Sequence, residues 1–483
     1  MEKVIVHKLD EVYNKIECDP STGYELNDYF TFDVPGAKFM PSYRNKIWDG
    51  KIRLFNALTC TLYAGLTKYL EEFCKSRNYE LELSDEFSSE EFSLKEAKDF
   101  IQKLNPKMQP RDYQHDAFVH AIRERRALLL SPTASGKSFI IYLLTRYYNA
   151  RTLIIVPNIS LVSQLASDFA DYGFDSSKHV HRIYAGQDKQ TDKPITITTW
   201  QSIYKLPKEY FQQFDVVIGD EAHLFKAKSL TSILTKLDTC KYRFGFTGTL
   251  DGTQTHKLVL EGLFGPVRRV TTTSELIEQK HLAEFKIKAI VLTYPDEIRQ
   301  MIARSADFQA EMDYIVRLQA RNNFIRNLAL SLNGNTLLLF QYVEKHGKVL
   351  YDMIAKEAGD RKVFYVSGSV DGNERERIRK IVENETNAII VASYGTFSTG
   401  INIRNLHNII FGSPSKSRVR NLQSIGRGLR KSDTKESATL FDIADDMSWK
   451  TRKNFTLLHF MERIKTYNEE KFSYKIYKVG LTI

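Results

Sequence analysis

Residues 131–138, with the sequence Ser-Pro-Thr-Ala-Ser-Gly-Lys-Ser, constrain the fold of this chain more than any other segment. An apolar run at 127–130 precedes them, and a helix-like segment at 139–148 follows. A strand, a loop and a helix in this order can form a phosphate-binding loop, because backbone N–H groups at a helix N-terminus create a cradle for anions. We therefore expect an α/β domain that binds a nucleotide.

The residues of this loop have distinct expected roles. Lys137 can reach the β- and γ-phosphates of ATP, and the Ser138 hydroxyl can ligate Mg²⁺. The loop begins with Ser131 where glycine is usual, so an ordinary turn containing Gly-Lys-Ser is the alternative. The cradle itself is expected from Thr133, Ala134, Ser135 and Gly136.

A second acidic motif, Asp220-Glu221-Ala222-His223, follows the apolar run 216–219. This order places two carboxylates at the C-terminal end of a strand, where α/β sheets bind ligands. We expect Asp220 to hold Mg²⁺ and Glu221 to polarise the attacking water, because phosphoryl transfer depends on positioning and charge neutralisation. A solvated acidic strand end is the alternative reading of the tetrapeptide alone.

The segment 423–430 carries a third candidate group. Arg427 and Arg430 lie three residues apart and would share one face of a helix that begins near Gln423. Arginine suits a γ-phosphate in its transition state because its planar fork donates two hydrogen bonds and stays charged. We predict that Gln423, Arg427 and Arg430 complete the ATP site across a cleft. The alternative is a solvated helix face, which is the usual role of two arginines on a lone helix.

These motifs, in this order, resemble those of superfamily 2 helicases and translocases, from Pro110 to Arg430. The resemblance implies that Arg111 and Gln114 read adenine, that Gly400 lies at the nucleotide, and that His223 links the ATP site to its neighbours. It also implies DNA contacts in the motifs around positions 157, 199, 247 and 396. The residues expected to contact DNA are Pro157, Asn158, Thr199, Trp200, Gln201, Thr247, Thr249 and Thr396.

Several of these positions are short hydroxyl side chains beside glycines. Thr247, Thr249, Ser393, Thr396 and Thr399 would let backbone N–H groups approach phosphates closely. Phosphate contacts set position without reading sequence, so we expect sequence-independent binding. Each residue taken singly reads equally well as a strand-end turn.

The order of apolar runs predicts the architecture. Strands are expected at 127–130, 153–156, 195–199, 216–219 and 242–246, and a second series at 287–292, 336–340, 362–366, 388–392, 408–411 and 438–442. A long helical stretch is expected around 299–332. This alternation predicts α/β folding with parallel sheets wrapped by helices. We predict two tandem RecA-like domains, 104–280 and 281–483, preceded by a small α+β domain, 1–103.

The first hundred residues lack an ATPase motif but carry a block of interleaved basic and aromatic residues at 38–54. Such interleaving suits phosphate contact and base stacking, although the core and rim of a small domain read similarly. The block resembles the N-terminal domain of the UvsW-type branched-DNA helicases of tailed phages. Its candidate DNA contacts are Arg44, Trp48, Lys51 and Arg53.

Composition agrees with a polyanionic partner. The net charge is +10, from 69 Lys and Arg against 59 Asp and Glu, which favours nucleic acid without separating DNA from RNA or from an anionic membrane. No apolar run reaches the ~18 residues of a membrane span, and the N-terminus lacks the apolar core of a signal peptide. The four cysteines show no paired spacing, so we expect ordinary thiols in a reduced, cytoplasmic setting. We also expect a monomer.

We therefore expect an ATP- and Mg²⁺-dependent DNA helicase that, as the resemblance implies, regresses forks and migrates four-way junctions. An RNA helicase or a duplex translocase of the restriction-motor type is the first alternative. A nucleic-acid-binding scaffold with a dead ATPase is the second. An ATPase assay with and without DNA separates the scaffold from the enzymes.

Overall fold

The computed structural model describes residues 2–84, 90–184, 188–305, 307–400, 403, 405–429 and 437–482. Contacts divide the chain into two compact units. Residues 1–131 and 136–271 make up the first unit, and residues 132–135 and 272–483 the second. Each unit is described by itself.

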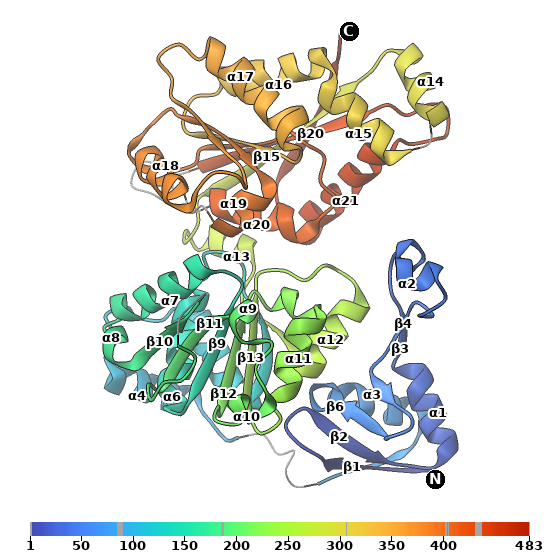
Figure 1. Cartoon of the computed structure of the whole chain (residues 1–483), viewed down its shortest axis with the longest axis vertical. Helices are drawn as coiled ribbons and strands as arrows, with labels where there is room; N and C mark the ends of the chain where they lie inside the picture. Colours follow the sequence, from blue (N-terminus) through green and yellow to red (C-terminus); the bar gives the residue numbers. More distant parts are fainter. Residues whose placement is uncertain are drawn as a thin grey trace. The chain divides into compact units, whose positions relative to one another are not determined.

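The first unit begins with a small domain built on a five-stranded sheet (Figure 1). Its order is β5-β6-β2-β1-β7, in which only β1 and β7 pair in parallel. Alternating residues such as Val4, Val6 and Ile16 are buried against Leu26 and Phe73. The elements are β1 Lys3–Lys8, β2 Tyr13–Glu17, α1 Pro20–Tyr29, β5 Phe55–Asn56, β6 Thr61–Tyr63, η2 Ala64–Leu66, α3 Thr67–Arg77 and β7 Glu80–Leu83.

A two-stranded ribbon rises from this domain and carries a helical tip (Figure 1). It consists of β3 Thr31–Asp33, η1 Ala37–Phe39, α2 Pro41–Arg44 and β4 Lys51–Arg53, and residues 31–53 are called the arm below. Gly50 has φ +79°, and a Cβ there would lie 3.0 Å from both Ala37 and Tyr43. Glycine is therefore required where the tip folds back onto the ribbon.

The larger part of the first unit is a seven-stranded parallel sheet of order β10-β11-β9-β12-β13-β8-β14. Helices cover both faces, with α4 to α7 on one and α9 to α12 on the other (Figure 1). Its strands are β8 Arg126–Leu130, β9 Thr152–Val156, β10 Val180–Ile183, β11 Ile195–Thr199, β12 Val216–Asp220, β13 Tyr242–Thr247 and β14 Val267–Arg269. Its helices are α4 Leu94–Leu104, α5 Asp112–Glu124, α6 Lys137–Tyr148, α7 Ile159–Asp171, α8 Ser176–His179, α9 Trp200–Ile203, α10 Lys208–Phe211, η4 Ala222–Lys226, α11 Lys228–Lys236 and α12 Gln254–Phe264.

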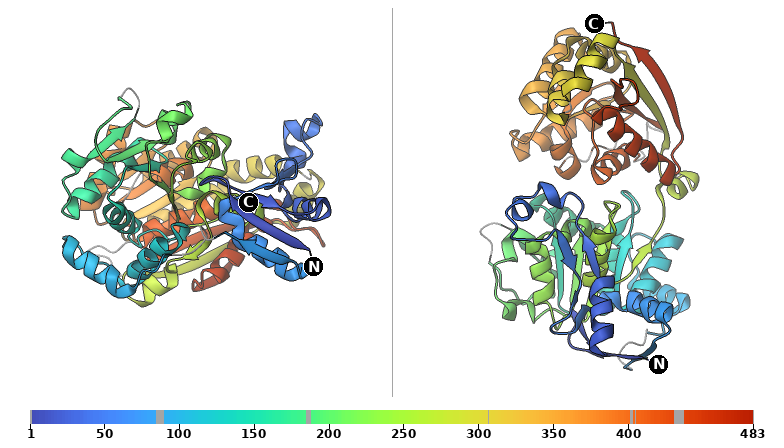
Figure 2. Two further views of the ribbon diagram at one scale, coloured as in Figure 1. Left: turned by 90° about the horizontal axis from the view of Figure 1, so that it is seen from below. Right: turned by 90° about the vertical axis from the view of Figure 1, so that its right-hand side faces the viewer.

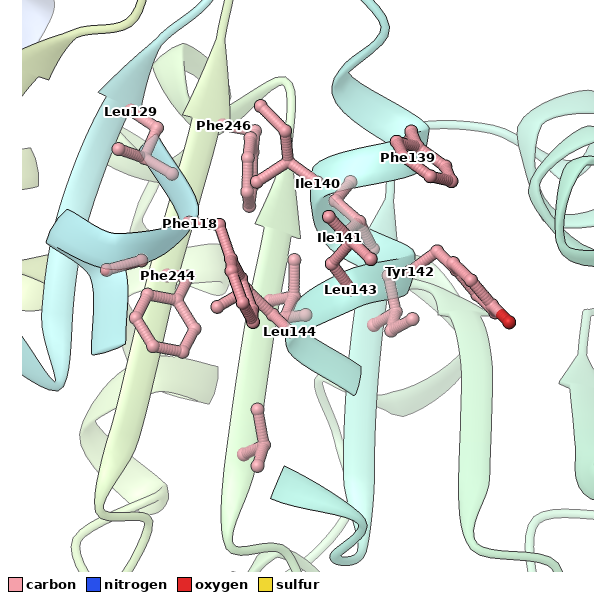
Figure 3. Close-up of a cluster of buried hydrophobic side chains, with 14 of the residues drawn as sticks. Phe118, Leu129, Phe139, Ile140, Ile141, Tyr142, Leu143, Leu144, Phe244 and Phe246 are labelled. Carbon is pink, nitrogen blue, oxygen red and sulfur yellow. The ribbon is translucent and has the colours of Figure 1, made fainter. Parts of the chain in front are cut away.

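Helix α6, which follows the phosphate loop, is buried along its first two turns. Every residue from Phe139 to Thr145 is buried, and Figure 3 shows the side chains of residues 139–144 beside Phe118 of α5 and Phe244 and Phe246 of β13. A helix that is apolar all round must be enclosed by other elements. The core of the domain therefore fixes the position of the loop at the helix N-terminus.

The second unit contains another seven-stranded parallel sheet, of order β17-β18-β16-β19-β20-β15-β21. The long strand β15 pairs with β20 on one side and with β21 on the other, at the sheet edge (Figure 2). Its strands are β15 Glu284–Thr293, β16 Thr336–Phe340, β17 Val363–Val366, β18 Ile389–Ser393, β19 Asn408–Phe411, β20 Ser437–Asp446 and β21 Tyr474–Gly480. Its helices are α13 Thr273–Glu278, α14 Asp296–Ser305, α15 Phe308–Arg317, α16 Gln319–Ser331, η5 Val343–Gly347, α17 Lys348–Glu357, α18 Gly372–Asn384, α19 Tyr394–Gly400, α20 Arg418–Gly428 and α21 Phe455–Glu469.

The predicted fold class is confirmed: two parallel α/β sheets follow a small mixed domain. The long helical stretch expected around 299–332 consists of three helices, α14 to α16. Asp307 ends the continuity because its carboxylate accepts from the N–H groups of Gln309 and Ala310 and starts a new helix. Strands β10, β14 and β21 were not predicted. No helix among the described residues is long and apolar enough to cross a membrane.

Candidate active site

The phosphate loop connects β8 to α6 and is shaped by two residues in the left-handed region. Ala134 has φ +66° and Gly136 has φ +79°. The Ser135 hydroxyl donates to the carbonyl of Pro132 at 2.7 Å, and the Ser131 N–H donates to the carbonyl of Thr247 at 2.8 Å. The loop therefore turns without an initial glycine because Ser131 is tied to the neighbouring strand β13. Thr133 is partly exposed on the loop, as are Lys137 and Ser138.

Gln114 lies against the phosphate loop. Its Nε2 donates to the carbonyl of Gly136 at 3.2 Å, while its Oε1 accepts from the N–H of Arg111 at 2.9 Å. A Cβ at Gly136 would lie only 2.4 Å from Gln114 Nε2, so the contact requires glycine. The Arg111 guanidinium donates to the Tyr113 hydroxyl at 2.7 Å. Residues 111–114, at the start of α5, therefore support the phosphate loop from within the protein.

The acidic pair lies at the end of β12, opposite Lys137. The Lys137 ammonium is 3.2 Å from Glu221 Oε1 and 3.8 Å from Asp220 Oδ1. Glu221 adopts φ +49°, and its N–H donates to Asp220 Oδ1 at 2.9 Å. This tight turn aims both carboxylates at the lysine. The geometry brings together the three charged groups that the sequence placed some eighty residues apart.

Burial and charge act differently on the two carboxyl groups, whose side chains are only 16% and 23% exposed. Burial raises the pKa of Asp220 above its ordinary value, although Lys137 opposes the shift. Burial also acts to raise the pKa of Glu221, but the Lys137 ammonium and the His223 imidazole outweigh it and hold that pKa well below its ordinary value. The neighbouring cationic groups therefore outweigh the burial of the Glu221 carboxylate. They do not outweigh the burial of Asp220, so a cation near Asp220 would stabilise its ionised form.

The donor set around Ser138 fits a magnesium ion. A hydroxyl and a carboxylate are the hard oxygen ligands that Mg²⁺ prefers, and a largely buried carboxylate with a raised pKa gains most from a nearby cation. Ser138 Oγ lies 2.7 Å from the hydroxyl of Tyr172, at the end of α7. Tyr172 is buried, so it holds the serine hydroxyl in a fixed place.

His223 connects the acidic turn to the end of β13. Its Nδ1 lies 3.3 Å from Glu221 Oε2 and 3.0 Å from Thr247 Oγ1, and Thr247 Oγ1 in turn donates to the carbonyl of Thr249 at 2.9 Å. Thr247 is fully buried. Its hydroxyl is thus engaged inside the protein, where it positions His223, and a contact between Thr247 and DNA stays a prediction. Thr249 is partly exposed, although its hydroxyl oxygen is buried, and its contact with DNA stays a prediction.

The other DNA candidates of the first unit lie at strand ends. Asn158 caps α7, since its Oδ1 accepts from the N–H of Leu161 at 3.0 Å, and Pro157 beside it is partly exposed. The buried Thr199 hydroxyl lies 2.9 Å from Ser202 Oγ, so it stabilises the start of α9. Trp200 is half-buried and packs on Tyr204, while Gln201 is exposed. Gln201 is therefore the most accessible member of this group.

In the second unit, Thr396 is buried and its Oγ1 accepts from Ser393 Oγ at 2.8 Å. Gly400 is the last residue of α19. Gln423 is partly exposed on α20, and Arg427 belongs to the same helix. Arg430 lies outside the described residues.

The four candidates on the arm differ in their surroundings. Arg44, Lys51 and Arg53 are exposed. Arg53 is paired with Asp49 at 2.5 Å, whereas the ring N–H of the half-buried Trp48 donates to the carbonyl of Lys51 at 2.8 Å. Trp48 therefore braces the tip against the ribbon.

Two residues that contact the site were missed by sequence reasoning. Tyr172 holds Ser138, and His256 of α12 donates from Nε2 to the carbonyl of His223 at 2.8 Å. Tyr172 directly follows an amphipathic helix, and His256 follows a turn that carries no recognisable motif. Only the fold brings them to the nucleotide site.

Comparisons with known proteins cover nearly the whole chain. Residues 3–84 match the family "DNA helicase UvsW, N-terminal", 107–252 match "Type III restriction enzyme, res subunit", and 319–432 match "Helicase conserved C-terminal domain". The ATP-dependent DNA helicase uvsW of Enterobacteria phage T4 is 38% identical, over 99% of this chain and 99% of the relative. The DNA 3'-5' translocase XPB2 of Sulfurisphaera tokodaii is 26% identical over 70% of this chain and 82% of its own.

Solved structures give the same relationship. The crystal structure of T4 UvsW matches with a TM-score of 0.53 at 36% identity, covering 99% of this chain and 100% of that one. A DNA-bound type ISP restriction-modification enzyme, LlaBIII, shares the fold, with a TM-score of 0.57 at 17% identity, over 77% of this chain and 32% of its own. The extent and identity of the T4 relationship are decisive, and this chain belongs to the UvsW family of superfamily 2 helicases.

Proposed function

We propose that this protein is an ATP-dependent DNA helicase that remodels branched DNA, regressing stalled forks and migrating four-way junctions during phage replication, recombination and repair. The observation that carries the proposal is the exposed arm. It is attached to a motor whose phosphate loop and acidic turn both lie at the C-terminal ends of strands of the same parallel sheet. The T4 relative, a phage DNA helicase with the same domain order, supports DNA as the partner and the cytoplasm of an infected cell as the setting.

The nucleotide chemistry follows from the charged groups at the loop. Lys137 binds the β- and γ-phosphates, while Ser138 and Asp220 hold Mg²⁺, which neutralises phosphate charge when bound. Glu221 stays ionised, because its pKa is held low, and accepts a hydrogen bond from the attacking water. Arg427 and Arg430 keep their proposed role at the γ-phosphate, and Gln423 lies on the same helix as Arg427.

Contacts to the DNA backbone are proposed for the accessible residues at the strand ends. Asn158 and Gln201 are polar and at least partly exposed on the first unit. Each presents an amide, which suits phosphate and sugar oxygens and carries no base preference. Movement along DNA would then be independent of sequence.

The tip of the arm presents apolar side chains to solvent. Phe39 and Ile47 are 66% and 79% exposed, and Met40 is 47% exposed. The exposed cations Lys38, Arg44 and Lys46 lie among them. Bases that lose their stacking partner at a branch offer flat apolar faces beside a phosphate backbone, and apolar side chains that contact such steps occur in DNA-bending proteins. We assign the arm to the branch point.

A strand-displacement assay tests the proposal. Forks, four-way junctions, linear duplexes and RNA duplexes are compared at equal ATP and Mg²⁺, with Glu221→Gln protein purified identically as the control for contaminating helicase. We expect forks and junctions to be processed faster than linear duplexes, and RNA duplexes least. Equal rates on all DNA substrates would contradict branch specificity.

A duplex translocase is the second candidate, favoured by the match of residues 107–252 to a restriction-enzyme motor subunit. Such a motor would hydrolyse ATP on linear duplex DNA and displace a third strand without unwinding forks. Displacement of the third strand with no fork regression would select it. A scaffold without activity is disfavoured, because Lys137, Asp220 and Glu221 are all present and in contact.

A further inference from the structure

Helix α12 begins beside the acidic turn of the ATP site. His256, in its first turn, is only 5% exposed. Its Nε2 lies 2.8 Å from the carbonyl oxygen of His223, so this nitrogen carries the hydrogen and donates it. Its Nδ1 lies 2.8 Å from Asp251 Oδ2, and Asp251 Oδ1 accepts from both the N–H and the hydroxyl of Thr253. The imidazole thus lies between the capping turn of α12 and the DEAH segment, residues 220–223, and its hydrogen bond to the His223 carbonyl joins α12 to that segment.

The N-terminal domain packs on the same helix, and this contact is called its seat below. Leu258 belongs to the core of that domain, together with Leu66 and Phe73. The carboxylate of Glu261, 3% exposed, accepts from the Tyr69 hydroxyl at 2.6 Å and from the N–H of Val267 at 2.8 Å. Figure 1 shows α12 on the side of the seven-stranded sheet of the first unit that faces β6.

The contact between domain and helix is backbone against backbone. A Cβ at Gly65 would lie 1.9 Å from the carbonyl oxygen of Glu261, and a Cβ at Gly262 would lie 2.9 Å from Tyr63. At the base of the arm, the Thr255 hydroxyl is 3.4 Å from the carbonyl of Asp33. Such close packing leaves no layer of side chains to absorb a displacement. A shift of the N-terminal domain must therefore move α12.

A movement of α12 would reach the residue that positions water. His223 is two residues from Glu221, and the intervening turn is fixed by the left-handed backbone of Glu221. The His223 imidazole also contacts the Glu221 carboxylate and the Thr247 hydroxyl. Pulling on the His223 carbonyl would thus reorient the Glu221 carboxylate relative to Lys137 without touching the phosphate loop.

We propose that α12 couples the N-terminal domain to ATP hydrolysis, and that His256 is a positioning residue that holds the DEAH segment in its hydrolytic arrangement. This inference rests on the proposed ATP-dependent activity of the same site. It gives the N-terminal domain a role in turnover in addition to contact with branched DNA.

The experiment measures DNA-stimulated ATP hydrolysis in full-length variants. We expect His256→Ala to lower kcat about tenfold, the equivalent of one lost positioning interaction, with the KM for ATP changed less than about twofold. His256→Gln keeps an amide donor of similar reach and should restore most of kcat. Rescue by glutamine and the split between kcat and KM would not result from simple loss of folding.

Gly65→Ala tests the other end of the helix without touching the ATP site. The added methyl group must separate the domain from α12, so we expect kcat to fall as it does in His256→Ala. Gly23→Ala is the matched control, since a Cβ there meets nothing closer than Cys18 Sγ at 3.9 Å. Tyr69→Phe, which removes only the hydrogen bond to Glu261, should lower kcat by a smaller factor.

Three outcomes would overturn the inference. These are a normal kcat in His256→Ala, a loss that glutamine does not rescue, or a Gly65→Ala protein that hydrolyses ATP like Gly23→Ala. Wild-type unwinding of forks is measured in parallel. If the wild type fails to unwind, the proposed function is wrong, whereas normal unwinding and turnover in all variants refutes only the coupling.

Discussion

Lys137 is paired with Glu221 at 3.2 Å and lies 3.8 Å from Asp220, so a phosphate must compete with these carboxylates for the ammonium. We expect Glu221→Gln to bind ATP at least as tightly as the wild type, because Lys137 loses a competing anion, and to hydrolyse it at least ~10²-fold more slowly. Lys137→Ala should instead lose ATP binding. Equilibrium binding of ATP and single-turnover hydrolysis separate the two variants.

The control for both variants is Asp112→Asn, an exposed carboxylate near the site on α5. It should leave binding and turnover unchanged. Near-normal turnover in folded Glu221→Gln protein would show that another group orients the water.

His346 makes the stability of the second unit dependent on pH. Burial, reinforced by Arg321, lowers its pKa to about 3 from an ordinary value of 6.5, and its Nδ1 lies 3.0 Å from Ser413 Oγ. The unfolded chain therefore binds the proton more tightly, so the contribution of His346 is complete above pH 6.5 and is lost as the pH falls toward 3. Each pH unit in this window should cost at most ~1.4 kcal/mol.

His346→Asn tests this expectation, because asparagine can keep a hydrogen bond to Ser413 but does not titrate. Urea unfolding at several pH values should give a shallower loss of stability in this variant between pH 6.5 and 4. Equal slopes in variant and wild type would show that His346 does not contribute.

At the residue scale, the sequence predicted the charged groups but not their supports. Lys137, Asp220 and Glu221 stand in motifs whose spacing reflects their chemistry, and the fold brings them together. Tyr172 and His256 act through contacts that depend on how α7 and α12 pack. The contact between the buried hydroxyl of Thr247 and His223 was likewise not visible in the sequence.

At the scale of elements, the central strands of both large sheets were predicted, whereas β17 was the one edge strand predicted and β10, β14 and β21 were missed. Strands such as β16 and β18 are buried along their whole length and are apolar except for one hydroxyl residue at an end, because parallel strands covered on both faces need no polar alternation. The edge strand β21 is exposed along most of its length and carries lysines. Its tyrosines, isoleucine and valine favour a strand, but it lacks the continuous apolar run of the central strands, and its pairing with β15 defines it.

Strand β20 also carries a buried ion pair that fixes the start of α20. The Nε of Arg463, on α21, donates to the Asp442 carboxylate at 2.9 Å. The Nη1 of Arg463 donates to the carbonyl of Ser415, two residues before the N-cap of α20. Arg463→Met would leave the Asp442 carboxylate buried without its cation, at a cost of ~3–5 kcal/mol in the free energy of unfolding. Hydrogen exchange of β20 amides in urea measures the loss.

Two companion variants make this test specific. The double variant Arg463→Met with Asp442→Leu removes both charges and should recover part of the loss. Lys348→Ala breaks an exposed pair with Glu344 and should cost less than ~0.5 kcal/mol. A loss in Arg463→Met no larger than in Lys348→Ala would mean that the buried pair contributes nothing.

At the scale of the whole molecule, the order of the motifs predicted the order of the domains, but the attachment of the N-terminal domain was not visible. Its seat on α12 depends on glycines at positions 65 and 262, which sequence alone does not relate to each other. Removing residues 1–103 would therefore expose Leu258 and deprive Glu261 of Tyr69. A test of branch recognition must leave this seat intact.

Replacement of residues 35–49 by Asn-Gly meets that requirement. Val34 N–H donates to the carbonyl of Gly50 at 2.8 Å, so a two-residue turn can close the ribbon between them. Base stacking is worth ~1–3 kcal/mol per base, so losing the tip should lower the preference for four-way junctions over linear duplexes about tenfold or more. ATP hydrolysis stimulated by single-stranded DNA should stay near the wild-type rate, because Asp33, Tyr69 and α12 are untouched.

Leu58→Ala is the matched control for the shortened arm. Leu58 is 97% exposed on the same domain, outside the arm, so its loss tests whether any exposed apolar residue suffices. The preference for junctions should persist in Leu58→Ala and fall in Phe39→Ala with Ile47→Ala. If the shortened protein kept the full preference for junctions, the branch would have to be recognised by the α/β domains, because the N-terminal seat and the ATP site are the same in both proteins.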